Sequence, residues 1–269
     1  MIKNMLPKDN ELPESTYEAK KAVCPLGLEV QKIHACPNDC ILYRGAYKDL
    51  NACPVCGALR YKISRDDPGD VEGERPRKKI PAKVMWYAPI IPRLKRLFQN
   101  KEHAKAMRWY REDRKKNEKL KVPADGSQWR KIERKYGKEF ADDARNVWFG
   151  LSAAADGINP FGEQSSNHST WHVTLCLYNL PPWLCMKRKF IMMPVLIQGP
   201  KQPSNDIDVY LRPLVEELLQ LWNGNGVRTW DEHRQEEFNL KALLLVTIND
   251  WPALSNLSGQ TNKGYQACT

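Results

Sequence analysis

The sequence predicts a mixed fold of the α+β or α/β class, organised around one sheet in its C-terminal half. Three apolar runs rich in β-branched residues are followed by an amphipathic helix and a fourth apolar run, which gives the order β-β-β-α-β. In chain order these segments are residues 147–155, 171–182, 189–200, 209–222 and 241–248. The first and the last of them run into an aspartate, Asp156 and Asp250. The predicted core is therefore a sheet with two acids at its edge.

Composition indicates an intracellular protein with an anionic partner. The 269 residues are enough to bury a substantial core, as one large domain or two smaller ones. The formal net charge of +10 favours nucleic acid as the partner, although solubility alone also produces such charges. No apolar run approaches the roughly 18 residues that span a bilayer, and residues 1–16 lack the apolar segment of a signal peptide. We therefore expect no membrane segment.

Four of the eight cysteines are spaced as metal ligands. They are Cys36, Cys40, Cys53 and Cys56. The first two form a C-x3-C loop and the last two a C-x2-C loop, and such loops present two pairs of thiolates to one tetrahedral Zn²⁺. A reducing cell interior favours metal over disulfides. We predict a structural zinc site of the zinc-ribbon kind. His34 and Cys24 are possible substitute ligands, or residues that contact the ligands. The alternative is two pairs of buried thiols without metal.

Charge and turn residues divide the chain into three predicted parts. Residues 1–63 hold a polar N-terminal segment and the zinc-ribbon-like module. Residues 64–146 hold a linker, rich in Gly, Pro and charge up to residue 79, and a basic helical region. Residues 147–269 hold the predicted sheet.

The positive charge is concentrated in one segment. Between Arg75 and Lys121 there are seventeen Lys or Arg residues and four Asp or Glu residues, so the remainder of the chain is slightly acidic. Apolar residues recur here with helical spacing that breaks near Gln99-Asn100. A charge run is usually a solvated helix face, but its localisation favours contact with the DNA backbone. The candidate contacts are Arg77, Lys78, Lys79, Arg93, Lys95, Arg96, Lys105, Arg108, Arg111, Arg114, Lys115 and Lys116.

Asp156 and Asp250 are candidate metal ligands because each follows a predicted core strand. Phosphodiester transfer needs an activated attacking oxygen and a stabilised leaving oxygen, and two Mg²⁺ ions held by carboxylates on neighbouring strands do both. In the predicted order the ends of the first and fourth strands can lie side by side, which would bring these two acids together. Taken singly, each of these aspartates could instead be a turn residue that ends its strand. Asp206 and Asp208 open the predicted helix, where acids are expected as caps.

Several longer motifs give the chain a family resemblance. They are HACPNDCILYRG, CPVCGALRYK, DGINPFG, WHVTLCLYNLPPWLCMK, IQGPKQPSNDIDVYLRPLVEELLQLW, INDWPALSNLSG and KGYQACT. From about Ile33 to its end, the chain resembles the transposase of plant CACTA (En/Spm-type) DNA transposons. The resemblance implies a nuclear protein with an RNase H-like DDE/D core that uses Mg²⁺ or Mn²⁺ and binds DNA at terminal inverted repeats. Self-association or an element-encoded accessory protein would provide further partners. By position, Asp156 would be the first catalytic acid and Asp250 the second, with Asp206 or Asp208 as a rival.

The chain departs from the family pattern near its C-terminus. It stops at Thr269, where the pattern continues with a segment that carries the third acid, and Gln260 stands where the family tends to have Trp. The helix and last strand that follow the fourth strand are expected to be missing. In a rearranged fold, stand-ins for the third acid would be Glu216, Glu217, Asp231 and Glu237.

We therefore expect a C-terminally truncated transposase-derived protein, with an incomplete RNase H-like core that has lost strand transfer. One alternative is a non-catalytic zinc-containing DNA-binding remnant or domesticated protein. Another is a fragment without a stable product, since an incomplete sheet exposes an unpaired edge.

Overall fold

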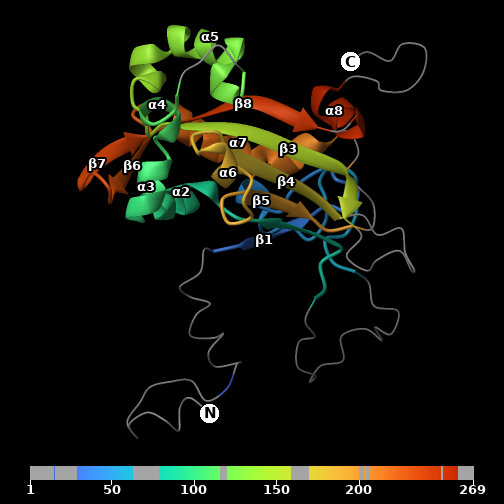
Figure 1. The fold of residues 1–269 in the computed structure, drawn as a ribbon. Coiled ribbons are helices and arrows are strands. Elements are labelled where there is room, and N and C mark those ends of the chain that lie inside the picture. Colours follow the sequence, from blue (N-terminus) through green and yellow to red (C-terminus); the bar gives the residue numbers. More distant parts are fainter. Residues whose placement is uncertain are drawn as a thin grey trace, which may run out of the picture.

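The computed structural model describes residue 15 and residues 29–62, 79–115, 120–158, 170–199, 203, 206–249 and 251–259, with the backbone alone for 154–158, 251, 252 and 256 (Figure 1). Its strands are β1 (Gln31–Ala35), β2 (Lys83–Tyr87), β3 (Val147–Ile158), β4 (Thr170–Leu177), β5 (Met192–Ile197), β6 (Val227–Asp231), β7 (Glu236–Leu240) and β8 (Ala242–Asn249). Its helices are α2 (Ile90–Phe98), α3 (Lys101–Ala106), α4 (Trp109–Glu112), α5 (Ser127–Lys135), α6 (Pro182–Cys185), α7 (Ile207–Trp222) and α8 (Trp251–Ser258). Shorter helical turns are η3 (Gly45–Tyr47), η4 (Pro123–Asp125) and η5 (Gly137–Ala141).

One mixed sheet of six strands, in the order β1-β2-β5-β4-β3-β8, organises the fold. Neighbouring strands are antiparallel except for β3 and β8, which run parallel. Because β3 and β5 both pair antiparallel with β4, these two strands and β8 all finish at the same end of the sheet. The connection from β5 to β8 passes through α7, which lies across one face of the sheet (Figure 1).

The predicted order of three strands, a helix and a fourth strand is confirmed by β3, β4, β5, α7 and β8. Three features differ from the prediction. First, β1 and β2 extend the same sheet, so all three predicted parts of the chain contribute strands to it. Second, β6 and β7 form a separate hairpin where the sequence reads as an acidic connection. Third, α8 follows β8 directly, so the expectation that this helix is missing is wrong.

The start of α8 has a local cause. Pro252 is its second residue, and a proline in the first turn of a helix sacrifices no intrahelical hydrogen bond because the N–H there has no partner. The same residue that breaks the strand ladder therefore begins the helix.

α7 buries one side against the sheet. Its buried residues are Ile207, Tyr210, Leu211, Pro213, Leu214 and Leu221. They join Val147, Phe149 and Leu151 of β3 in the main apolar core. The amphipathic helix predicted for residues 209–222 is confirmed, with Leu211, Leu214 and Leu221 buried. Val215 is apolar too, but it is 42% exposed and lies on the flank of the helix.

A second core lies on the opposite face of β3, where Trp148 points because side chains alternate along a strand. Trp148 stacks on Trp129 of α5, with ring centroids 3.8 Å apart and planes 16° apart. Tyr110 of α4 and Phe140 of η5 contact the edges of the same rings. This aromatic cluster holds the helical region against the start of β3.

Figure 1 shows α2 to α5 gathered at the end of the sheet where β3 begins, and α8 at the end where β3 and β8 finish. The predicted helix break is confirmed, since α2 ends at Phe98 and Asn100 caps α3 by accepting the His103 N–H. Among the described helices, none has both the length and the apolar character needed to cross a bilayer.

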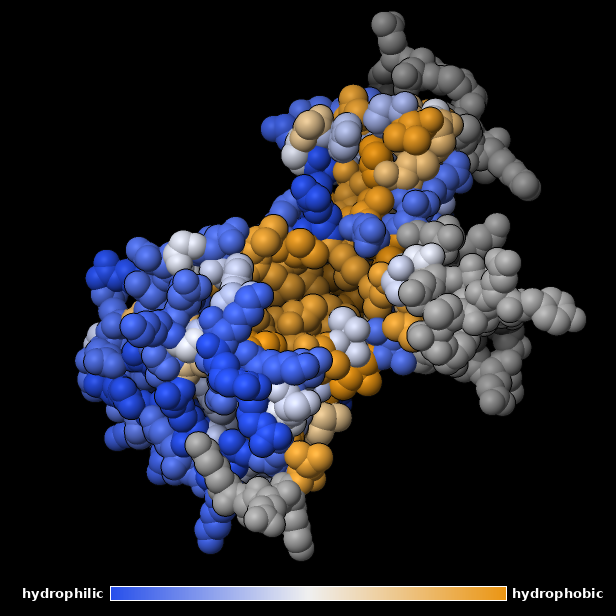
Figure 2. Space-filling view, turned by 90° about the horizontal axis from the view of Figure 1, so that it is seen from above, coloured by the Kyte–Doolittle hydropathy of each residue, from blue (hydrophilic) through white to orange (hydrophobic). Residues whose placement is uncertain are grey.

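Seen from above, the molecule has a hollowed apolar surface at its centre, in the region of β8 (Figure 2). Three side chains of β8 contribute exposed apolar area: Leu244, Val246 and Ile248 are 37%, 40% and 54% exposed.

Candidate functional site

The ends of β3 and β8 lie side by side. Their parallel register pairs Ala153 with Asn249, and the Ala153 N–H donates to the Asn249 side-chain oxygen at 3.1 Å. The predicted pairing of the first and fourth strands is therefore confirmed. Asp250 lies outside the described residues, and only the backbone of Asp156 is described, within β3. The meeting of their two carboxylates stays a prediction.

Asp206 and Asp208 lie at the same end of the sheet. β5 finishes at this end, and α7 then runs back to Trp222, which packs on Tyr136 near the start of β3. Asp206 occupies the N-cap position of α7 without a side-chain capping hydrogen bond. Both aspartates are exposed. The Asp206 carboxylate therefore does not accept the backbone hydrogen bond that the predicted capping role requires.

The four predicted zinc ligands converge. The Sγ atoms of Cys36, Cys40, Cys53 and Cys56 all lie within 4.8 Å of one another. A tetrahedral Zn²⁺ with bonds of about 2.3 Å needs sulfurs about 3.8 Å apart, so this spacing fits the ion. Cys36 and Cys53 are buried, whereas Cys56 is exposed. The four side chains can therefore hold one zinc ion.

Local hydrogen bonds prepare part of this cluster for a cation. The Ala58 backbone N–H lowers the pKa of Cys56 to about 6, and the Asn38 side chain also donates to its sulfur. Burial, together with hydrogen bonds to neighbouring thiols, raises the pKa of Cys40 to about 12. Cys56 is therefore the thiol of this cluster that ionises most readily, and thiolates are the form that binds zinc. Zinc would supply the positive charge that lets the remaining thiols ionise.

The alternative ligands are not part of the cluster as described. His34 Nδ1 accepts a hydrogen bond from Arg60 Nε at 2.9 Å, so this ring faces the arginine. Cys24 lies outside the described residues.

A buried polar contact that the sequence does not predict joins the first cysteine loop to the sheet. Asp39, between Cys36 and Cys40, accepts hydrogen bonds from Lys83 of β2 and from the Tyr210 hydroxyl of α7. The side chains of Asp39 and Lys83 are only 11% and 8% exposed. Asp39 also has a left-handed backbone, φ 64°, which aspartate tolerates better than most residues. The only signal in the sequence is an acid in a metal-binding turn.

The twelve candidate DNA contacts fall into three groups. Outside the described residues lie Arg77, Lys78 and Lys116. Engaged in contacts with other parts of the chain are Arg93, Arg108, Arg111 and Arg114. Exposed or half-exposed are Lys79, Lys95, Arg96, Lys105 and Lys115. The side chains of the second group hold helices and turns in place, which leaves the third group as the better candidates for phosphate contact.

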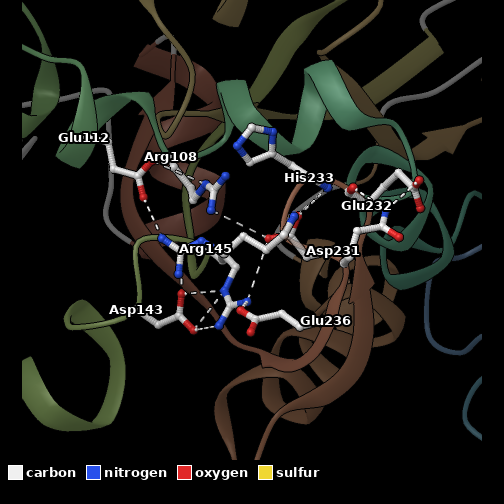
Figure 3. Close-up of polar contacts among 10 residues, drawn as sticks. Arg108, Glu112, Asp143, Arg145, Asp231, Glu232, His233 and Glu236 are labelled. Carbon is white, nitrogen blue, oxygen red and sulfur yellow. Dashed lines mark hydrogen bonds and ion pairs between the residues drawn. The ribbon is translucent and has the colours of Figure 1, made fainter.

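Arg108 belongs to an ionic network at the end of the sheet where β3 begins (Figure 3). Its side chain is 2% exposed and lies 4.0 Å from the fully buried Asp231. Arg145 bridges Asp143 and Glu236, each at 2.7 Å, and also approaches Asp231 (Figure 3).

A cleft of about 530 Å³ lies beside this network. The cations of the cleft and network are Arg108, Arg111, Lys138, Arg145 and Arg234. The acids are Glu112, Asp142, Asp143, Asp231 and Glu236. Most of these cations are paired with acids of the set, and the pairs join the β6–β7 hairpin to the helical region.

The four acids considered as stand-ins for a third catalytic acid already have other partners. Asp231 lies in the ionic network. Glu217 accepts hydrogen bonds from the Tyr87 hydroxyl and the Ile90 N–H, at the start of α2. Glu216 pairs with Arg44, and Glu237 pairs with Arg228.

A family model described as "Transposase family tnp2" matches residues 117–269, more than half of the chain. The matched segment contains β3 to α8 but not the cysteine cluster or α2 to α4. No curated protein and no solved structure matches the chain.

Proposed function

The chain belongs to the transposase family tnp2, and from this premise we propose that it is a DNA-binding protein whose lineage chemistry is metal-dependent cleavage and joining of DNA at transposon ends. The CACTA (En/Spm-type) lineage belongs to this proposal and rests on the sequence motifs. The observation that carries the chemistry is the parallel pairing of β3 and β8, whose ends adjoin the predicted acids.

The sheet supports an RNase H-like core for this proposal. Counting from β5, the order β5-β4-β3-β8 combines three antiparallel strands with a fourth, parallel strand reached through α7. Polar groups at the ends of strands joined by such a crossover gather at one end of the sheet. Asp206 and Asp208 begin α7 at this end, so they are candidates for an additional ligand.

We assign Asp156 and Asp250 as the residues that would hold Mg²⁺ or Mn²⁺. Carboxylate oxygens are the ligands that these hard cations prefer, whereas the cysteine cluster suits zinc. Divalent cations at such a site activate the attacking oxygen and stabilise the leaving oxygen of a phosphodiester. The parallel pairing of β3 and β8 supports this assignment, because Asp156 belongs to β3 and Asp250 follows β8 in the sequence.

DNA binding is assigned to the exposed cations of the basic region. Lys79, Lys95, Lys105 and Lys115 are exposed or half-exposed along and around α2 to α4. Phosphate contacts of this kind make affinity fall with salt, with a slope of about 0.9 per phosphate neutralised. The zinc site we propose as structural, because Asp39 in its first loop joins it to β2 and α7 through Lys83 and Tyr210.

The test is nicking of an end-labelled transposon-end duplex in Mg²⁺ or Mn²⁺. We expect Asp156→Ala and Asp250→Ala each to lower cleavage by several orders of magnitude if the site acts as a unit. Asp49→Ala, which removes an exposed acid from the zinc module, is the matched control and should cleave normally. Cleavage that survives both strand-end substitutions would contradict the assignment.

A non-catalytic DNA-binding protein is the second candidate function. This candidate is favoured because the acids that could replace a missing third catalytic acid already have other partners. Glu216, Glu217 and Asp231 are held in such contacts. Absence of cleavage with intact, salt-dependent duplex binding would establish this candidate. Replacing Lys95 and Lys115 by Gln should then reduce the salt slope by about 1.8, whereas Arg212→Gln with Arg228→Gln, a pair of exposed cations outside the basic region, should not.

A further inference from the structure

A groove lies between α3–α4 and the turn that contains α6. It has a volume of about 400 Å³, within the range of small-molecule sites. Its lining residues are Glu102, His103, Lys105, Ala106, Trp109, Asp113, Pro181, Leu184, Lys189 and Phe190. The two walls come from segments far apart in the sequence, so the groove exists only in the folded protein.

Aromatic rings stand along this groove. Trp183 of α6 is 64% exposed, and its ring centroid lies 5.6 Å from that of Trp109 with the planes at 76°. His103 and Phe190 form a second edge-on pair, with centroids 5.1 Å apart. Trp109 supports Trp183 from one side, and the exposed area of Trp183 leaves ring surface open for stacking.

Exposed cations lie in the groove lining and on the turn that carries Trp183. Lys105, Lys187 and Arg188 are exposed and have no ion-pair partner within the described ranges of the chain. Lys189 lies 4.8 Å from the centre of the Phe190 ring. Within the lining, Lys105 and Lys189 are matched by Glu102 and Asp113. The exposed Lys187 and Arg188 on the turn beside it give the groove and this turn together a net positive charge. Ring faces flanked by unpaired cations suit a ligand that combines a flat base with a phosphate.

We propose that this groove binds an unpaired nucleotide of single-stranded DNA, with the base stacked on Trp183 and the phosphates held by Lys105 and Lys189. The inference rests on the proposed DNA-binding function and adds that part of the bound DNA is single-stranded. Stacking on an indole is tolerant of sequence because every base has a π-face. A purely apolar protein partner would leave the cations without a role.

The groove is remote from the predicted acids. α6 follows the end of β4, where Leu177 pairs with Phe149 near the start of β3. From Phe149 to Asp156 an extended strand covers roughly 20 Å. The nucleotide in the groove therefore lies several nucleotides away from any bond cut at the ends of β3 and β8.

The test compares fluorescence anisotropy of three labelled ligands of equal length, about 12 nucleotides. They are oligo(dT), an abasic oligonucleotide with the same phosphates, and a duplex. The wild-type protein should bind oligo(dT) roughly tenfold more tightly than the abasic strand. Trp183→Ala should remove this preference and Trp183→Phe should keep part of it. Trp230→Ala, at a tryptophan 39% exposed on β6, should keep all of it.

A charge variant tests the phosphate contacts. Lys105→Gln with Lys189→Gln should weaken oligo(dT) and the abasic strand by the same factor, because both carry the same phosphates. Equal wild-type affinity for the two strands, or a Trp183→Ala protein with an unchanged preference, would overturn the inference. If duplex binding persists in that case, the proposed function stands; loss of binding to all three ligands would overturn both.

Discussion

The four cysteine thiols are positioned by their own short loops, which is why the sequence predicts them. Backbone N–H groups that contact their sulfurs include those of Asn38 and Ala58, each within two residues of a ligand. The ionic network around Arg108 is the opposite case. Its buried partner Asp231 is distant in sequence, so a count of charges reads Arg108 as a surface cation. Spacing reveals local chemistry, whereas a charge pair formed by tertiary contact leaves no local pattern.

At the residue scale we predict one zinc ion per chain, lost on removal of one loop of ligands. Cys53→Ser with Cys56→Ser leaves two thiolates, too few for a tetrahedral site. Metal analysis of the purified protein should show the zinc content falling to near zero. Cys176→Ser with Cys185→Ser, two half-buried thiols outside the cluster, is the control and should keep the zinc. Full zinc in the first double variant would rule out this ligand set.

At the element scale, periodicity identifies the segments that are apolar over most of their length. It predicts β3, β4, β5, α7 and β8, and it places the break between α2 and α3. It misses β1, β2, β6 and β7, which are five residues each. β1, β6 and β7 are about half polar, whereas β2 is mostly apolar but too short to show a period. Their strand character depends on partners elsewhere in the chain, as β2 shows by bridging β1 and β5. The side chains of Asp156 and Asp250 lie beyond what the structure describes, so the carboxylate site stays a prediction.

The contact between the cysteine loop and the sheet gives a prediction about how the two are coupled. Asp39→Asn keeps the left-handed turn accessible but leaves Lys83 as a buried, unpaired charge. Breaking a buried pair costs about 3 to 5 kcal/mol in the free energy of unfolding. Urea unfolding of the zinc-loaded protein should show this loss. Glu216→Gln, which breaks the exposed pair with Arg44, is the control and should cost less than about 1 kcal/mol. Equal costs for the two variants would contradict a buried role for Asp39.

At the scale of the whole molecule, β1 and β8 form the two edges of the six-stranded sheet. β1 and β2 extend it beyond β5, whereas no described strand pairs with the outer edge of β8. Exposed apolar side chains of β8 contribute to the hollow seen in Figure 2. An unpaired strand edge with apolar neighbours is a template for association with another chain.

We therefore predict that the isolated protein self-associates through β8. Val246→Lys should reduce this association, because a charge on an edge strand opposes edge-to-edge pairing and Val246 is 40% exposed. Sedimentation velocity over a range of concentrations measures the effect as a shift from larger species to monomer. Leu120→Lys adds the same charge at a residue that is 77% exposed and outside every strand, and it should leave the association unchanged. A wild-type protein that stays monomeric at all concentrations, or an equal response to both substitutions, would show that β8 does not mediate association.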